Sequence, residues 1–208
     1  CFLNLAAGSQ GNSGKTKMSD SWNTLHKTSG DWGYAACFYK LSQIPGKKIH
    51  VPLGLYASRI FFSFKSPLYI HFFNNIDAMG YTAPSMAAGE ADPSYGIRYD
   101  IIELTYNDAA HAGMFANTSR VDAFQYPMAL RVEGDGRDQV VGEKLKYADV
   151  ISRWNTALGN TDYNVCVRNI ITKDNLGPII EQPSKVPAFQ NTQSFRDFND
   201  YVNRIWNA

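Results

Sequence analysis

The chain has 208 residues, of which 44% are hydrophobic and 19% are charged, and its formal net charge is +1. This composition predicts one large packed domain, or one and a half ordinary ones, and excludes a disordered chain. The balanced charge argues against a broad basic surface for nucleic acid or anionic lipid, and no apolar run approaches the roughly 20 residues of a membrane-spanning helix. We therefore expect an uncharged ligand and neither a nucleic-acid nor a membrane partner.

Residues 1–135 are expected to be mostly strand. After an opening rich in Gly, Ser and Asn, short runs of β-branched and aromatic residues follow one another. These runs are KKIHVPL, SRIFFSF, LYIHFF, IIELTY, VDAFQY and MALRV. They are separated by turn formers such as Ser66-Pro67, Asp92-Pro93 and Gly134-Asp135-Gly136. Several short strands with regular turns predict an antiparallel β-sandwich or barrel.

The remainder, residues 136–208, is expected to be a smaller, helix-rich α/β portion. Apolar residues recur at helical spacing through EKLKYADVISRWNTALG, and Gly159 is expected to end that helix. A short strand over DYNVCVRNII and a Pro-rich loop follow. The run SFRDFNDYVNRIWNA predicts a terminal helix, capped by Ser194, whose apolar stripe needs a surface to pack on. We expect helices over most of 140–158 and 195–206.

Three cysteines, Cys1, Cys37 and Cys166, lack the spacing of metal ligands. Their odd number leaves either one disulfide with one free thiol or three buried thiols, and both alternatives stay open. The chain begins with Cys1 and shows no signal peptide, so it resembles a mature or trimmed product. A disulfide would favour secretion, which we take as the expected localisation.

Glu103 is a carboxylate on an otherwise apolar predicted strand. Alternation places it on one face with Ile101 and Thr105. Asp122 follows in the next predicted strand, 19 positions later (122 − 103 = 19). If these strands pair, both carboxylates face one cleft, as glycoside hydrolysis requires: one carboxyl protonates the leaving oxygen while the other activates water or attacks the sugar. The pair therefore predicts a candidate hydrolase site.

The neighbours of the two acids favour different roles. Leu104 beside Glu103 lowers the local polarity and favours a protonated acid, whereas Arg120 near Asp122 favours an ionised carboxylate. Two acids on neighbouring strands are common, so spacing alone carries little weight. Asp100 competes with Glu103 as the acid, although strand parity puts it on the other face.

Three segments match a known family pattern: ASRIFFS at 57–63, DPSYGIRYDIIELTYND, and FANTSRVDAFQYPMALRV. Together they resemble the core of glycoside hydrolase family 64, β-1,3-glucanases with a thaumatin-like β-barrel. The glutamate strand of that family matches Glu103, Thr105 and Asn107, and its aspartate strand matches Ser119 and Asp122. The tail FNDYVNRIW also resembles a helix of the family.

This resemblance implies an inverting endo-hydrolase of β-1,3-glucan that needs neither a metal nor an organic cofactor. Glu103 would be the general acid and Asp122 the general base, with carboxyl groups roughly 6.5–9.5 Å apart. Thr105, Asn107 and Ser119 would share the strand face of their neighbouring acid and bind sugar hydroxyls.

Two further candidate substrate-binding residues come from the same resemblance. Phe115 stands where the family carries a sugar-stacking Trp. Arg59 matches the arginine of a family turn, which appears here as Ser58-Arg59, and its alternative role is a structural ion pair with an acid. Family members extend beyond both ends of this chain, so its α/β portion is expected to be incomplete.

Several alternatives remain beside this hypothesis. Tyr81, Tyr95 and Tyr99 could line a sugar groove or pack in the core. The histidines are expected to be non-catalytic, and the glycosylation sequon at 117–119 to be unmodified. For the whole chain, the alternatives to a monomeric hydrolase are a non-catalytic carbohydrate-binding thaumatin-like protein and a fragment of a larger enzyme.

Overall fold

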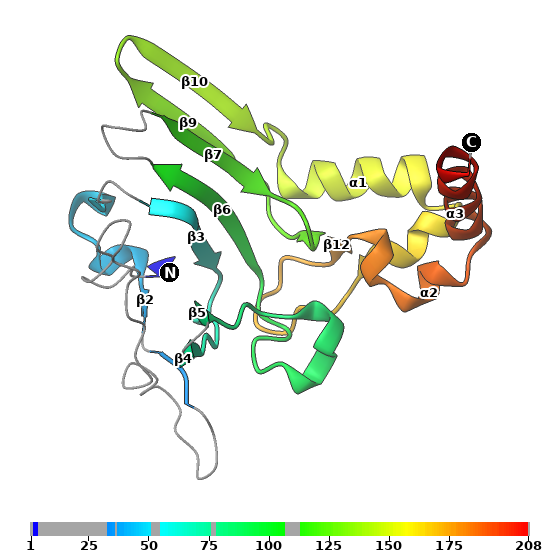
Figure 1. The fold of residues 1–208 in the computed structure, drawn as a ribbon, viewed down its shortest axis with the longest axis horizontal. Coiled ribbons are helices and arrows are strands. Elements are labelled where there is room, and N and C mark those ends of the chain that lie inside the picture. Colours follow the sequence, from blue (N-terminus) through cyan, green and yellow to red (C-terminus); the bar gives the residue numbers. More distant parts are fainter. Residues whose placement is uncertain are drawn as a thin grey trace. The chain divides into compact units, whose positions relative to one another are not determined.

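The computed structural model describes residues 2–3, 33–35, 37–50, 55–75, 78–106 and 113–207 (Figure 1). The chain forms two compact units, Cys1–Ser119 and Arg120–Ala208. This division falls earlier than the change of periodicity near residue 135, because Arg120 bonds to Glu143 and the strand after Asp122 pairs with a later one.

The first unit is built on an antiparallel sheet of three strands in the order β3-β6-β7 (Figure 1). The strands are β3 (Leu55–Ser63), β6 (Tyr99–Tyr106) and β7 (Met114–Ser119). The strand expected over IIELTY is therefore confirmed, since its β-branched and aromatic residues suit a half-buried pleated surface.

Smaller elements complete the first unit. They are the pair β1 (Phe2–Leu3) and β2 (Phe38–Tyr39), the hairpin β4 (Phe72–Asn75) and β5 (Ala78–Tyr81), and the 3₁₀ helices η2 (Leu41–Gln43), η3 (Pro45–Lys47) and η4 (Met86–Ala91).

The strand expected over 47–53 is wrong where the structure describes it. Lys47 ends η3, and residues 48–50 have no regular structure. Pro45 starts that turn and Gly46 has φ +57°, a backbone conformation that a strand does not use. Residues 51–53 lie outside the described residues.

The core of the first unit lies beside this sheet. Phe61 from β3 and Tyr99 from β6 pack there with residues from other segments, namely Ala35, Cys37, Leu68, Ile70 and Ile97. Tyr99 is buried, which supports the alternative that it packs in the core over the alternative that it lines a sugar groove. Asp100 is also buried.

The second unit has a small sheet and a hairpin, both antiparallel. The sheet order is β11-β12-β8, formed by β11 (Val167–Arg168), β12 (Ile179–Glu181) and β8 (Ala123–Phe124). The hairpin consists of β9 (Ala129–Gly134) and β10 (Arg137–Gly142). The expected turn at Asp135-Gly136 is confirmed, and both residues have positive φ, as a two-residue hairpin turn requires.

The helices of the second unit, together with two 3₁₀ turns, occupy the part that was expected to be helical. They are α1 (Tyr147–Leu158), α2 (Pro187–Gln190) and α3 (Gln193–Trp206), with η6 (Asp162–Cys166) and η7 (Pro183–Lys185). The first helix starts later than expected because 137–142 pairs with β9. Gly159 ends α1 as predicted. The first half of the strand expected over 162–171 is instead η6, and β11 follows it.

The predicted cap of the terminal helix is wrong by two residues. Thr192 is the N-cap, and its Oγ1 accepts a hydrogen bond from the Phe195 N–H at 3.3 Å. Ser194 lies inside α3, and its N–H donates to Asp162 Oδ2 at 3.0 Å. The carboxylate of Asp162, which belongs to another element, therefore accepts a hydrogen bond from a backbone N–H in the first turn of α3.

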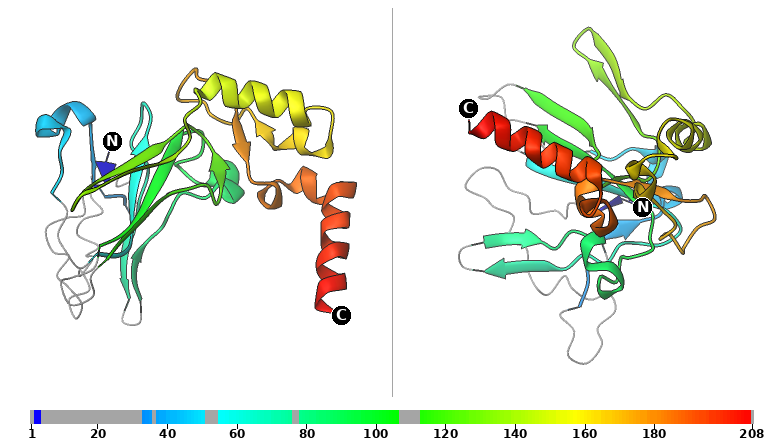
Figure 2. Two further views of the ribbon diagram at one scale, coloured as in Figure 1. Left: turned by 90° about the horizontal axis from the view of Figure 1, so that it is seen from above. Right: turned by 90° about the vertical axis from the view of Figure 1, so that its right-hand side faces the viewer.

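The second core is formed where α1, η6, β12 and α2 meet. It contains Cys166, Ile180, Val186 and Phe189, with Trp154 packed against them. The straight helix α3, red in Figure 2, presents Phe198, Tyr201, Ile205 and Trp206 to solvent. The partner surface expected for this stripe is therefore not found among the described residues.

The fold class is mainly β with antiparallel sheets, plus helices in the second unit. Across the described ranges the sheets are separate and do not close into a barrel, which was one of the two expected architectures. Cys37 and Cys166 are free, buried thiols, and burial raises their pKa values to about 12 and about 11. Cys1 lies outside the described residues. No helix in the described part of the chain is long and apolar enough to span a membrane.

Candidate active site

Glu103 lies in the middle strand of the three-stranded sheet, directly opposite Arg59 on β3. Arg59 Nε donates a hydrogen bond to Glu103 Oε1 at 3.0 Å. Both side chains are partly exposed, Arg59 by 37% and Glu103 by 31%. The alternative role of Arg59, an ion pair with an acid, is therefore present in the structure, and the acid is the candidate catalytic one.

Tyr81 at the end of β5 is the third member of this group. Its side chain is hydrogen-bonded to Arg59. Burial raises the pKa of Tyr81, and the positive charge of Arg59 opposes that shift without cancelling it. Arg59 thus contacts both a neutral phenol and a carboxylate. Sequence reasoning considered Tyr81 only for a groove or the core, because no local pattern connects it with Arg59.

The same sheet face carries other candidate residues. Cross-strand neighbours point to one side of a sheet, so the pairs Glu103–Asn117 and Thr105–Phe115 share the face of Arg59. Phe115 is 68% exposed. The face therefore presents a carboxylate, amide and hydroxyl groups and an open aromatic ring, which are the groups that bind sugars.

Thr105 also has a structural contact. Its Oγ1 accepts a hydrogen bond at 3.0 Å from the N–H of Ala57, which has a φ of +47° beside the register shift in β3. This bond satisfies a backbone donor that the irregular ladder leaves unpaired. The Thr105 hydroxyl keeps its own hydrogen to donate.

Two remaining candidates differ in what can be described. Ser119 is buried at the end of β7, opposite Ile101, so it shares the face of Glu103 rather than that of Asp122 as expected. Asn107 lies outside the described residues.

Asp122 does not lie within a strand. It occupies a bend between β7 and β8, and the strand that pairs with β6 ends at Ser119. The pairing of two acid-bearing strands, which was the condition for a shared cleft, is therefore not found: β6 pairs with β7, and β8 pairs with β12. Instead, the carbonyl of Asp122 accepts a hydrogen bond from the Gln182 N–H at 2.8 Å, and Asp122 Oδ1 lies 3.5 Å from Lys185 Nζ. Its side chain is 44% exposed.

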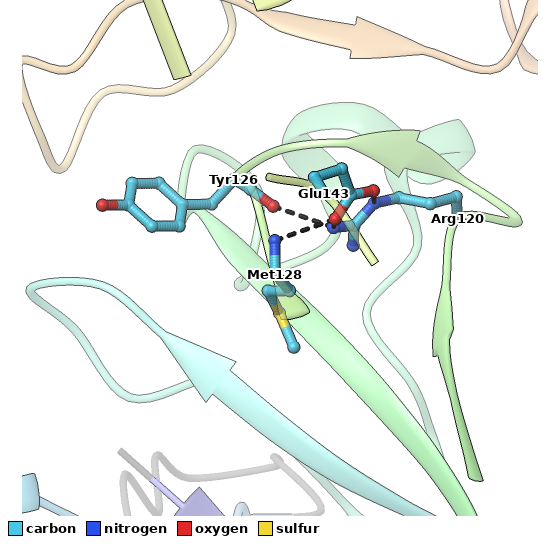
Figure 3. Close-up of polar contacts among 4 residues, drawn as sticks. All are labelled: Arg120, Tyr126, Met128 and Glu143. Carbon is cyan, nitrogen blue, oxygen red and sulfur yellow. Dashed lines mark hydrogen bonds and ion pairs between the residues drawn. The ribbon is translucent and has the colours of Figure 1, made fainter. Parts of the chain in front are cut away.

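Arg120 has a different partner from the one that sequence proximity indicated. Its guanidinium forms two hydrogen bonds with the Glu143 carboxylate, at 2.9 and 2.7 Å, and donates to the Tyr126 carbonyl (Figure 3). Glu143 also accepts from the Met128 N–H. Burial alone would raise the pKa of Glu143, but these donors outweigh burial and lower it. This network closes the base of the β9–β10 hairpin.

The two candidate carboxylates belong to different units, since the division falls between Ser119 and Arg120. Their separation and a common groove therefore stay predictions. In the described residues no three His, Cys, Asp or Glu side chains are grouped so as to hold a metal ion. Each of the two acids, Glu103 and Asp122, lies beside a cation and is partly exposed to solvent.

Comparison with known proteins gives two findings. A family model described as β-1,3-glucanase, glycoside hydrolase family 64, matches residues 11–208. A solved structure of a GH64 β-1,3-glucanase domain from Clostridium beijerinckii is similar, with a TM-score of 0.73 and 24% identity over 91% of this chain. The match covers 49% of that chain, so this chain spans about half the length of the solved domain. No curated protein sequence matches significantly.

Proposed function

The chain belongs to the β-1,3-glucanase family of glycoside hydrolases, family 64, and we propose that it hydrolyses internal linkages of β-1,3-glucan. The observation that carries this proposal is the partly exposed Glu103 carboxylate, held by Arg59 on a sheet face that also bears the exposed ring of Phe115. A neutral polysaccharide also suits a chain whose net charge is +1.

In the proposed reaction the two carboxyl groups act on one glycosidic bond with inversion. Glu103 gives its proton to the leaving oxygen as the bond from that oxygen to the anomeric carbon breaks. Asp122 takes a proton from a water molecule, whose oxygen attacks the anomeric carbon from the opposite face. Room for that water requires carboxyl groups roughly 6.5–9.5 Å apart. Exchange with solvent then returns a proton to Glu103 and removes one from Asp122.

Arg59 and Tyr81 orient the proposed acid. Arg59 Nε donates its hydrogen bond to Oε1 of Glu103. The other carboxyl oxygen, Oε2, is therefore the one that would carry the catalytic proton. Tyr81 is also hydrogen-bonded to Arg59. Because a catalytic carboxyl group must be held to within about half an ångström, this arrangement on strands supports Glu103 as one of the two catalytic carboxyl groups.

Sugar binding is assigned to residues around the acid. Phe115 stacks on a sugar face, since an exposed aromatic ring offers a flat apolar surface. Thr105 donates its hydroxyl hydrogen to a sugar oxygen while its oxygen remains bonded to Ala57. Asn107 and Ser119 are the further proposed hydrogen-bonding residues.

The decisive test is incubation with linear β-1,3-glucan, followed by analysis of the released oligosaccharides and their anomeric form. Internal cleavage with inverted products supports the proposal. Glucan binding without any release favours the alternative, a non-catalytic carbohydrate-binding protein. That alternative is supported by the ion pairs that engage both carboxylates.

Three accompanying properties are also proposed. The antiparallel sheets would form part of a thaumatin-like core, the protein would act outside the cell because its substrate is a polymer, and it would act as a monomer. Fractionation of the native source and size-exclusion chromatography test the last two. Intracellular retention or a stable dimer would contradict them.

A further inference from the structure

A row of three polar residues crosses the β3-β6-β7 sheet. Arg59, Glu103 and Asn117 are direct neighbours in the strand ladder, so their side chains leave the sheet on the same face. Arg59 and Glu103 are hydrogen-bonded to each other. Asn117 completes the row from β7, where it is exposed. The acid of the proposed reaction therefore has an arginine on one side and an exposed amide on the other.

This polar row lies where the sheet face leaves the core of the first unit. The neighbouring row on one side is Phe61, Ile101 and Ser119, of which Phe61 is 1% and Ser119 6% exposed. The neighbouring row on the other side contains Thr105 and Phe115, whose ring is open to solvent. A ligand on this face is therefore excluded from the buried row and meets the polar row together with the aromatic ring.

The amide of Asn117 is the group of the polar row that is available to a ligand. Within the described part of the chain its side chain makes no hydrogen bond, whereas the guanidinium and the carboxylate of the same row bind each other. A side-chain amide offers two donor hydrogens and an acceptor oxygen, and a sugar hydroxyl both donates and accepts. The two groups are therefore complementary.

We propose that Asn117 is a substrate-binding residue that holds a hydroxyl group next to the oxygen that Glu103 protonates. This assignment rests on the proposed hydrolysis of β-1,3-glucan. In that polymer the cleaved oxygen is attached to C3 of the leaving sugar, and the ring carbons on either side, C2 and C4, carry hydroxyl groups. Residues directly opposite in a ladder have Cβ atoms about 4.5–5.5 Å apart. A sugar whose C3 oxygen contacts Glu103 therefore has one of these hydroxyls within reach of the Asn117 amide.

Asn117 and Phe115 have complementary tasks on β7. They stand two residues apart on one face, about 6.6 Å along the strand, so one oligosaccharide can contact both. Stacking on the ring of Phe115 holds a sugar by an apolar contact without fixing its rotation. A hydrogen bond from Asn117 is directional and sets which sugar oxygen faces Glu103. The amide thus fixes the register of the glucan against the acid.

The test measures binding in Glu103→Gln protein, which should not turn the ligand over, by titration calorimetry with a short soluble β-1,3-gluco-oligosaccharide. Adding Asn117→Ala should raise Kd by about fivefold to tenfold, the effect of one net hydrogen bond. Asn117→Leu, which keeps the side-chain volume and removes its polar atoms, should do the same. The matched control is Thr118→Val, a change of similar shape on the opposite face of the same strand, which should leave Kd within about twofold.

Melting temperatures show that each variant is folded. Unchanged affinity in both Asn117 variants overturns the proposal, because the amide would then be merely solvated. An equal loss in Thr118→Val overturns it too, since a general disturbance of β7 would be the cause.

Kinetics in the otherwise wild-type chain separates this proposal from the proposed function. Asn117→Ala should raise KM by the same factor and leave kcat near wild type, because the contact is present in both the bound substrate and the transition state. If the wild-type chain releases no oligosaccharide but Asn117→Ala still weakens binding, the hydrolysis fails and the binding residue stands. If the wild-type chain cleaves glucan and Asn117→Ala changes neither KM nor affinity, only the role of Asn117 fails. A chain that neither binds nor cleaves β-1,3-glucan overturns both.

Discussion

In the β3-β6-β7 sheet, Glu103 meets Arg59 across a strand ladder, and the hydrogen-bonded atoms lie 3.0 Å apart. Asp122 instead occupies a bend before β8 and meets Lys185, from a short 3₁₀ turn, at 3.5 Å. A planar guanidinium fixed by a neighbouring strand sets the direction of a carboxylate, whereas an ammonium on a flexible stem supplies charge without direction. The orientation of Glu103, the proposed acid, is thus fixed by a directional hydrogen bond. Asp122, the proposed base, is held mainly by the hydrogen bond of its backbone carbonyl and by the charge of Lys185.

The largest expected effect comes from the acids themselves. Glu103→Gln and Asp122→Asn should each lower kcat on soluble β-1,3-glucan by about 10²- to 10⁴-fold, because an amide can neither donate the catalytic proton nor accept one from water. Binding isotherms should stay near wild type. Full activity in Glu103→Gln would remove the central assignment, and a joint loss of binding and melting temperature would indicate structural carboxylates.

Exchanging the cations tests the contrast directly. Arg59→Lys keeps the charge but loses the planar contact to Oε1, so kcat should fall by about tenfold or more. Lys185→Arg, the matched change beside Asp122, should alter kcat by less than about threefold, because direction matters little there. Equal losses in the two variants would contradict the difference between the two environments.

Tyr81→Phe removes only the hydroxyl that contacts Arg59. We expect kcat to fall by a few-fold, about the effect of one hydrogen bond worth roughly 1 kcal/mol, with KM unchanged. Tyr201→Phe is the control, since it removes a phenol hydroxyl on the exposed face of α3 that has no assigned part in the site. A change in KM alone would mean that Tyr81 binds glucan instead of orienting Arg59.

The smallest effect on activity is expected at Glu143, whose ion pair with Arg120 closes the hairpin base. Glu143→Gln should leave kcat unchanged and lower the free energy of unfolding by about 1 kcal/mol, since the pair is partly exposed. The pKa of Glu143 is lowered in the folded state, so its contribution is present above the unfolded pKa and lost as pH falls through the folded one. Urea unfolding at neutral and acid pH measures both effects. A lowered kcat would connect this network to catalysis.

Local patterns predicted the elements whose signal is contained in a few adjacent residues. The strand around Glu103, the helix ended by Gly159 and the turn at Asp135-Gly136 are each specified by their own composition. The helix cap was misplaced because Thr192 and Ser194 are both good N-cap residues, and only the structure shows that Thr192 caps α3 while the Ser194 N–H donates to Asp162 from another element.

For the candidate site, the sequence predicted which residues would take part, but it did not predict which side chains would pair with one another. The motifs pointed to Glu103 and Asp122, but proximity in sequence paired Asp122 with Arg120, whereas the fold brings Lys185 to it.

The exposed stripe of α3 ends in Trp206, whose side chain is 86% exposed. An indole in water emits at longer wavelength than one in an apolar contact, so this residue is a built-in fluorescent reporter for the helix. The difference between the emission spectra of the wild-type protein and Trp206→Phe isolates its signal from the other three tryptophans. A shift of that difference spectrum to shorter wavelength, together with reduced quenching by acrylamide, would show that Trp206 has become buried against another surface.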